Sequence, residues 1–173
     1  MREWYYTGSY WGERKETPLD AARRAELFFH MLRRCDPTFA QWYRGGRGAP
    51  RSLPGHAVRS DVSEWEQLFL RGRARSDFDK KIIIEEFGFS EYVWNTKGAD
   101  RTRIEMSVGA YSRRATNVCV LSPPHEGPSR ERILSVPVQA EVLISMATAW
   151  DPDFAVATSS QMVDLIEKRE DEV

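Results

Sequence analysis

One cysteine–histidine pair in the chain has the residue types needed for nucleophilic catalysis. Cys119 lies shortly before His125 and Glu126, and an imidazole can activate a thiol for attack on an acyl group. However, the aliphatic residues around Cys119 predict a buried strand, and burial disfavours the thiolate. No helix start follows the cysteine to lower its pKa. We therefore predict an inert thiol, no catalytic residues and a protein that is not an enzyme.

Metal and phosphate sites are not indicated by the residue spacing. Neither Cys-x-x-Cys nor His-x-x-x-His occurs, and the three histidines are far apart in the sequence. The run Gly45-Gly46-Arg47-Gly48 has the glycines of a phosphate-binding loop. It lacks a following Lys-Ser/Thr pair and a preceding strand of a nucleotide-binding fold. We therefore expect no metal and no cofactor.

Residues 44–75 combine arginines with aromatic side chains, a combination typical of nucleic-acid binding. Carboxylates interrupt this segment, and the isoelectric point of the chain is about 6.3, well below the ~9 of a dedicated nucleic-acid-binding domain. Ion pairing with the acidic second half of the chain is the preferred interpretation. An arginine-rich nucleic-acid-binding accessory domain remains the alternative function.

A group of acidic and aromatic residues in the middle of the chain predicts a protein-docking surface. Aromatic anchors supply most of the binding energy of such surfaces, and carboxylates steer the encounter. Glu85 and Glu86 are adjacent on a predicted strand, so their side chains point to opposite faces and at least one meets solvent or an ion-pair partner. The predicted partner-binding residues are Glu85, Glu86, Glu91, Tyr92, Trp94 and Asp100.

The net charge of −1 conceals two unequal halves. Residues 1–75 carry 14 basic and nine acidic side chains, a balance of +5, and residues 76–173 carry 11 and 17, a balance of −6. Two cysteines are too few for a disulfide framework. No apolar run approaches the ~18 residues of a membrane span, and no signal peptide is visible. We expect a cytoplasmic protein that does not enter membranes.

The elements that must position these residues follow from capping signals and periodicity. Thr17-Pro18-Leu19-Asp20 marks a helix start, and apolar residues from Ala21 to Leu32 recur at helical spacing. Residues 102–108 alternate polar and apolar side chains, as in a strand with one covered face. The predicted elements are strands at 4–11, 39–44, 81–87, 92–94, 102–108, 117–121 and 154–158, and helices at 18–35, 62–71, 137–150 and 161–168.

These elements predict an α+β fold with a central, mostly antiparallel sheet and helices packed on it. A single domain over 1–173 is expected, comprising a strand–helix unit (1–42), an Arg/Gly loop and helix (43–76), antiparallel strands (77–122) and a last segment of loop, helix, strand and terminal helix (123–173).

An internal similarity indicates two related helix–Asp-Pro–strand halves. Residues 25–40 and 140–155 share seven identities in sixteen positions, including both Asp-Pro pairs. Each Asp-Pro is expected to end its helix, because the residue before proline disfavours the helical conformation. The similarity predicts a buried stripe on the second helix that matches the first, formed by Ala140, Leu143, Ile144, Ala147 and Trp150.

Three motifs in this order resemble the immunity protein 52 family of bacterial polymorphic-toxin systems. They are Tyr5-Tyr6-x-Gly8-x-Tyr10-Trp11-Gly12-x-Arg14-x-Glu16, then Asp36-Pro37-x-Phe39-x-x-Trp42, and finally Trp150-Asp151-Pro152-Asp153. The likeness extends to about residue 160, and residues 43–80 carry little of it.

The resemblance implies an α+β antitoxin that binds and neutralises a cognate toxin, usually a nuclease of the restriction-endonuclease fold encoded next to it, in competition between bacteria. Inhibition would be by stoichiometric protein–protein binding, with no direct contact to nucleic acid and with an oligomeric state that the sequence leaves open. The residues matched to the family's motifs are expected to be structural; they are Trp11, Arg14, Phe29, Asp36, Phe39, Trp150 and Asp151.

Overall fold

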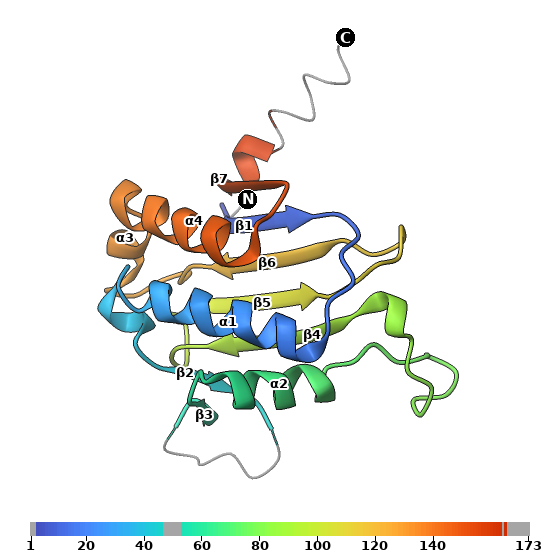
Figure 1. Ribbon diagram of the computed structural model, residues 1–173. Coiled ribbons are helices and arrows are strands. Elements are labelled where there is room, and N and C mark those ends of the chain that lie inside the picture. The colour runs from blue at the N-terminus through green and yellow to red at the C-terminus, as the bar shows by residue number, and fades with distance from the viewer. Residues whose placement is uncertain (1–2, 47–52, 164, 166–173) are drawn as a thin grey trace.

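The computed structural model describes residues 3–46, 53–163 and 165. Its helices and strands are shown in Figure 1. In order, they are β1 (Tyr5–Trp11), α1 (Pro18–Leu32), the 3-10 turn η1 (Pro37–Phe39), β2 (Trp42–Arg44), β3 (His56–Val58), α2 (Val62–Arg71), the 3-10 turn η2 (Glu85–Phe87), β4 (Phe89–Trp94), β5 (Arg103–Val108), β6 (Asn117–Ser122), α3 (Arg130–Ile133), α4 (Val136–Trp150) and β7 (Phe154–Ser159).

The seven strands form one sheet in the order β3-β2-β4-β5-β6-β1-β7, and every neighbouring pair is antiparallel. Helices α1, α2 and α4 lie side by side on one face of this sheet (Figure 1). Within the described residues, no helix covers the opposite face. The predicted α+β fold with a mainly antiparallel sheet is confirmed.

A row of contacting aromatic rings runs through the core between the sheet and the helices. Trp11 of β1 stacks on Trp150 of α4 with ring centroids 5.7 Å apart, and Phe28 of α1 lies 6.2 Å from Trp150. Phe29 continues the row to Trp65 of α2 at 4.6 Å. Aromatic side chains bury large apolar areas, so these rings supply much of the energy that holds the helical layer on the sheet.

Helix α1 forms as its sequence predicts but ends earlier. Thr17 and Asp20 form a capping box at its start, and the residues that the stripe predicts, from Ala21 to Leu32, are buried. The last helical residue is Leu32, because residues 33–35 tighten into a turn with three-residue hydrogen bonds. The Asp36-Pro37 pair therefore begins η1, with Asp36 as its cap, and does not end α1.

The predicted buried stripe of α4 is wrong except for Trp150. Val142, Ser145, Met146 and Ala149 face the core with Trp150, whereas Ala140, Ile144 and Ala147 are exposed and Leu143 is half-buried. Glu141 is the one charged residue of this helix. A helix that is apolar almost all round gives no periodic signal for the face that packs. The two helix–Asp-Pro–strand halves therefore share their element order and differ in their packing.

The predicted strand at 81–87 is also wrong. Ile83 forms an isolated bridge with Arg75, and Glu85–Phe87 form η2. Gly88 has a φ of 66°, and a side chain there would place its Cβ 2.2 Å from the carbonyl oxygen of Val108. The chain turns sharply at this glycine and enters the sheet only at Phe89, so the isoleucine-rich run stays outside the sheet.

Candidate functional site on the open face of the sheet

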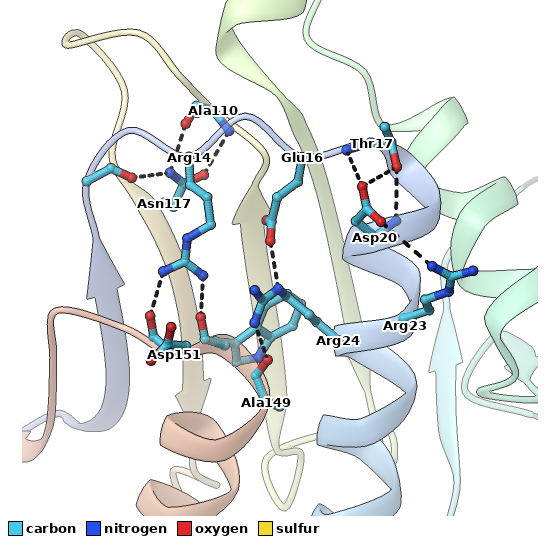
Figure 2. Close-up of polar contacts among 12 residues, drawn as sticks. Arg14, Glu16, Thr17, Asp20, Arg23, Arg24, Ala110, Asn117, Ala149 and Asp151 are labelled. Atoms are coloured by element: carbon cyan, nitrogen blue, oxygen red, sulfur yellow. Dashed lines mark hydrogen bonds and ion pairs between the residues drawn. The ribbon is translucent and has the colours of Figure 1, made fainter.

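Arg14, one of the residues matched to the family's motifs, holds the β1–α1 loop against the end of α4 (Figure 2). The Arg14 guanidinium donates hydrogen bonds of 2.5 Å to the carbonyl oxygens of Trp150 and Asp151, and it lies 5.3 Å from the centre of the Trp11 ring. The Arg14 backbone N–H donates to Ala110. A cation at the carbonyl end of a helix stabilises that end. Arg14 thus anchors α4 to the sheet.

Arg24 of α1 extends this arrangement through a buried carboxylate (Figure 2). Its guanidinium donates to the carbonyl oxygen of Ala149 at 3.0 Å and pairs with Glu16 at 2.7 Å. Burial raises the pKa of Glu16, although the charges of Arg24 and Arg14 oppose the shift. These contacts join α1 to α4, so we assign them a structural role.

Asp36 connects the segment that follows α1 to α3. Its side chain accepts hydrogen bonds from the Thr38 backbone and hydroxyl at 2.8 and 2.7 Å, and from two guanidinium nitrogens of Arg132 at 2.5 and 3.2 Å. Burial alone would raise the pKa of Asp36, but the bonds from Arg132 and Thr38 outweigh it and lower the pKa. Phe29 and Phe39 are buried in the core nearby.

The six predicted partner-binding residues do not lie together. Tyr92 and Trp94 point to the open face of β4, whereas Glu91 points to the helix side, where burial raises its pKa. Asp100 accepts hydrogen bonds from the Ser129 hydroxyl and backbone N–H, at the start of α3. Glu85 and Glu86 are exposed in η2, which comes just before the first residue of β4, whereas Tyr92 and Trp94 lie toward the last. Their predicted opposite orientation assumed a strand that does not form.

The open face is the sheet surface that no helix covers, and it is mostly aromatic and aliphatic. An uncovered antiparallel face usually carries polar side chains. Here Arg103 and Glu105 are its charged members, and they pair with each other at 2.6 Å. By strand register the face comprises Tyr43, Ser90, Tyr92, Trp94, Arg103, Glu105, Ser107, Val118, Val120, Ser122, Tyr6, Gly8, Tyr10, Phe154, Val156 and Thr158.

The aromatic rings of this open face hold one another in position. Tyr10 stacks on Phe154 at 4.9 Å and Tyr92 on Trp94 at 5.6 Å, yet Tyr92 is 50% exposed and Phe154 is 60% exposed. The Arg103 guanidinium lies over the Tyr92 ring at 5.4 Å. Aromatic and arginine side chains that are exposed but already ordered are typical anchors of protein–protein interfaces.

Sequence reasoning identified two of these aromatic residues and missed the others. Tyr6, Tyr10 and Phe154 come together because β1 pairs with both β6 and β7, a long-range arrangement. One local signal was available: Tyr6 and Tyr10 lie an even number of residues apart in a strand whose intervening positions hold Thr7 and Ser9. That alternation places Tyr6 and Tyr10 on one face and Tyr5 and Trp11 on the other.

The Cys119–His125 pair does not form. Cys119 is fully buried on the helix side of β6, and burial raises the pKa of its thiol. His125 instead contacts the edge of the Trp4 ring at 4.4 Å. Among the described residues, no group of three His, Cys, Asp or Glu side chains is arranged to hold a metal ion.

The arginines of residues 44–75 differ in their partners: Arg59 pairs within its own segment, whereas the charges of Arg44 and Arg71 oppose the rise in the pKa of Glu91 in the second half. Arg59 contacts Asp61 at 3.4 Å and Glu64 at 3.2 Å, both in its own segment. The expected ion pairing of this segment with the acidic second half is therefore wrong for Arg59, because the N-terminal cap of α2 supplies nearer carboxylates. Arg47 and Arg51 lie outside the described residues.

We predict that the Cys119 thiol is unreactive in the folded protein. In a Cys35→Ser variant, which leaves Cys119 as the sole thiol, a chromogenic disulfide reagent at pH 8 should give no signal over the minutes in which free cysteine reacts completely. Urea should expose the thiol and restore one equivalent of reaction. Rapid native-state labelling would instead indicate an accessible thiolate and contradict the buried position.

The structure defines an α+β protein in which helices pack on one face of an antiparallel sheet and aromatic side chains are exposed on the other face. The sequence model of the immunity protein 52 family matches residues 3–172, nearly the whole chain. The chain therefore belongs to the immunity protein 52 family. A search of curated proteins finds no match. In the part of the chain that the structure describes, no helix has the length and hydropathy needed to span a membrane.

Proposed function

We propose that this immunity protein neutralises a cognate toxin by stoichiometric binding, without chemistry of its own. The observation that carries the proposal is the open face, which presents ordered and exposed aromatic side chains in a chain of the immunity protein 52 family. Leaving such a surface in water has a free-energy cost, which a partner that covers it removes.

The toxin is a nuclease in this proposal, following what the family resemblance implies. A metal-dependent nuclease needs carboxylates that hold its metal ions and a basic surface that binds phosphates. A protein that covers either part stops the reaction with one contact surface and no turnover. The immunity protein acts in the cytoplasm, where a toxin that enters a kin cell meets nucleic acid.

The interface in this proposal retains Tyr92 and Trp94 from the sequence prediction. Glu85 and Glu86 are a separate candidate contact, because η2 is exposed and lies apart from the aromatic rings. Glu91 and Asp100 contribute indirectly, since the first points to the helix side and the second is bonded to Ser129.

The test is protection of cells that express the toxin from the neighbouring gene. Wild-type immunity protein should restore growth and co-purify with the toxin at a ratio of one to one. The Tyr92→Ala, Trp94→Ala double variant should weaken binding at least about tenfold. A Glu85→Lys, Glu86→Lys variant is the matched comparison. If this variant loses more affinity for the toxin than the aromatic double variant does, the interface lies at η2. If the wild-type immunity protein fails to restore growth in cells that express the toxin, the proposal is overturned.

The alternative function, a nucleic-acid-binding accessory domain, is supported by one feature of the open face and can be tested with the same variants. Exposed aromatic rings next to arginines also suit base stacking. Fluorescence anisotropy with single-stranded DNA and RNA at low salt should give no binding if the aromatic face serves a protein partner. Retention of oligonucleotides that is lost in the Tyr92→Ala, Trp94→Ala variant would support the alternative.

A further inference from the structure

A groove crosses the open face where β1, β6 and β5 meet the loop that joins β4 to β5. Its volume is about 430 Å³. Its walls are largely aromatic, and its lining includes two guanidinium groups and no carboxylate. The residues that matter for the argument are Trp4, Tyr6, Tyr10, Arg101, Arg103 and His125.

The two arginines of this groove differ in their partners. Arg103 is paired with Glu105 at 2.6 Å, so its charge is largely satisfied within the protein. Arg101 is exposed and lies over the Trp94 ring at 5.9 Å. Among the described residues, Arg101 makes no ion pair. It is therefore a cation beside an aromatic ring, with no ion-pair partner among the described residues.

The position of Arg101 on an aromatic ring suits it to bind a carboxylate. Contact between a guanidinium and a ring uses the face of the guanidinium and leaves its N–H groups free at the edge. Two parallel N–H donors match the two oxygens of a carboxylate, and this pairing is stronger than a neutral hydrogen bond. A partner that covers the groove would exclude water from this pair, and that would strengthen it further.

We propose that this groove receives an acidic side chain of the toxin, with Arg101 as its principal partner and the rings of Trp4 and Tyr10 as apolar walls. This inference rests on the proposed function and names the chemistry of its contact. It reverses the sign expected from the acidic second half of the chain, since the immunity protein contributes the cation and the toxin the carboxylate. The metal-binding centre of a nuclease is one place where a toxin presents such carboxylates.

The experiment measures the dissociation constant for the purified, catalytically inactivated protein encoded by the neighbouring gene. Arg101→Ala should weaken binding at least about tenfold and Arg101→Glu at least about a hundredfold, whereas Arg101→Lys should retain part of the affinity. Arg113→Ala is the matched control. Arg113 is an exposed arginine in the β5–β6 connection, paired with Glu13 at 3.5 Å, and its removal should leave binding unchanged.

Salt dependence adds a second readout that a purely structural role would not change. Raising NaCl from about 50 to about 500 mM should weaken wild-type binding more than binding of Arg101→Ala, because the variant lacks the charge that salt screens. Thermal unfolding should be the same for all these variants, since Arg101 is exposed.

The outcomes separate the inference from the function on which it rests. If Arg101→Glu binds as tightly as wild type, the acidic contact lies elsewhere and the inference is overturned, while the immunity function stands. If the wild-type chain does not bind the neighbouring gene's product at all, both are overturned. Selective loss in the Arg101 variants, with Arg113→Ala unaffected, supports the inference.

Discussion

Replacing Trp150 with alanine should lower the free energy of unfolding by about 3–5 kcal/mol, which is the range for removing a large aromatic side chain from a packed core. Trp150 is fully buried, stacks on Trp11 at 5.7 Å and lies 6.2 Å from Phe28. Its ring therefore joins β1, α1 and α4, and its loss leaves a cavity where the three elements meet. A small domain has only ~5–15 kcal/mol of stability in total.

Thermal unfolding followed by circular dichroism measures this effect. A loss of that size should lower the Tm by roughly 10–15 °C in a domain of this length. Trp4→Ala is the matched control, because the same substitution is made at a side chain that is 53% exposed. Equal shifts for Trp150→Ala and Trp4→Ala would show that the row of aromatic rings does not hold the layers together as described.

The sheet and the first helix could be predicted because polar and apolar residues are regularly spaced in their sequences. In β5 polar and apolar residues alternate, and in α1 the arginines lie off a clear apolar stripe, so one face is marked for burial. Helix α4 has no such regular spacing, and its packed face was set by the contacts with α1 and β1. The run at 82–84 has high β propensity, but Gly88 turns the chain before it can join the sheet.

The candidate site was only partly predictable for a different reason. Tyr92 and Trp94 are close in sequence, and their aromatic character on a strand marked them as anchors. The other half of the surface, with Tyr10 and Phe154, depends on β1 lying between β6 and β7. Pairing between strands so distant in the chain leaves no local pattern, because side-chain alternation specifies a face and not a neighbour.

The two faces of the sheet carry different kinds of residues. The motif residues with which the family resemblance was drawn, such as Trp11 and Arg14, hold the covered face and the ends of the helices. The aromatic rings and Arg101 lie on the opposite face, outside the core between the sheet and the helices. A partner surface can thus vary without loss of the fold, which is what an immunity protein that matches one particular toxin requires.

Replacing Asp36 with asparagine should lower the stability at pH 7 by about 2 kcal/mol, since it removes a charged acceptor from a two-point contact with a guanidinium that is 49% exposed. The asparagine oxygen can still accept from the Thr38 backbone, so η1 should keep its cap. The loss is in the connection between the α1 end and α3, which Asp36 and Arg132 make across 96 residues of sequence.

The pH dependence identifies the carboxylate as the cause. The pKa of Asp36 is lowered in the folded state, so the ionised form contributes stability above the unfolded-state pKa of about 3.9, and this contribution is lost as pH falls through the folded-state pKa. Urea unfolding at pH 7 and pH 3 should therefore show a large difference between wild type and Asp36→Asn at pH 7 and a smaller one at pH 3.

Asp77→Asn is the matched control, because Asp77 also has a lowered pKa, from its hydrogen bond with Lys80, but its side chain is 94% exposed. Solvent screening leaves such a surface pair with little effect on stability. A difference between wild type and Asp36→Asn that stays constant with pH would assign the loss to altered packing and would remove the ion pair from the account of how the helical layer is held.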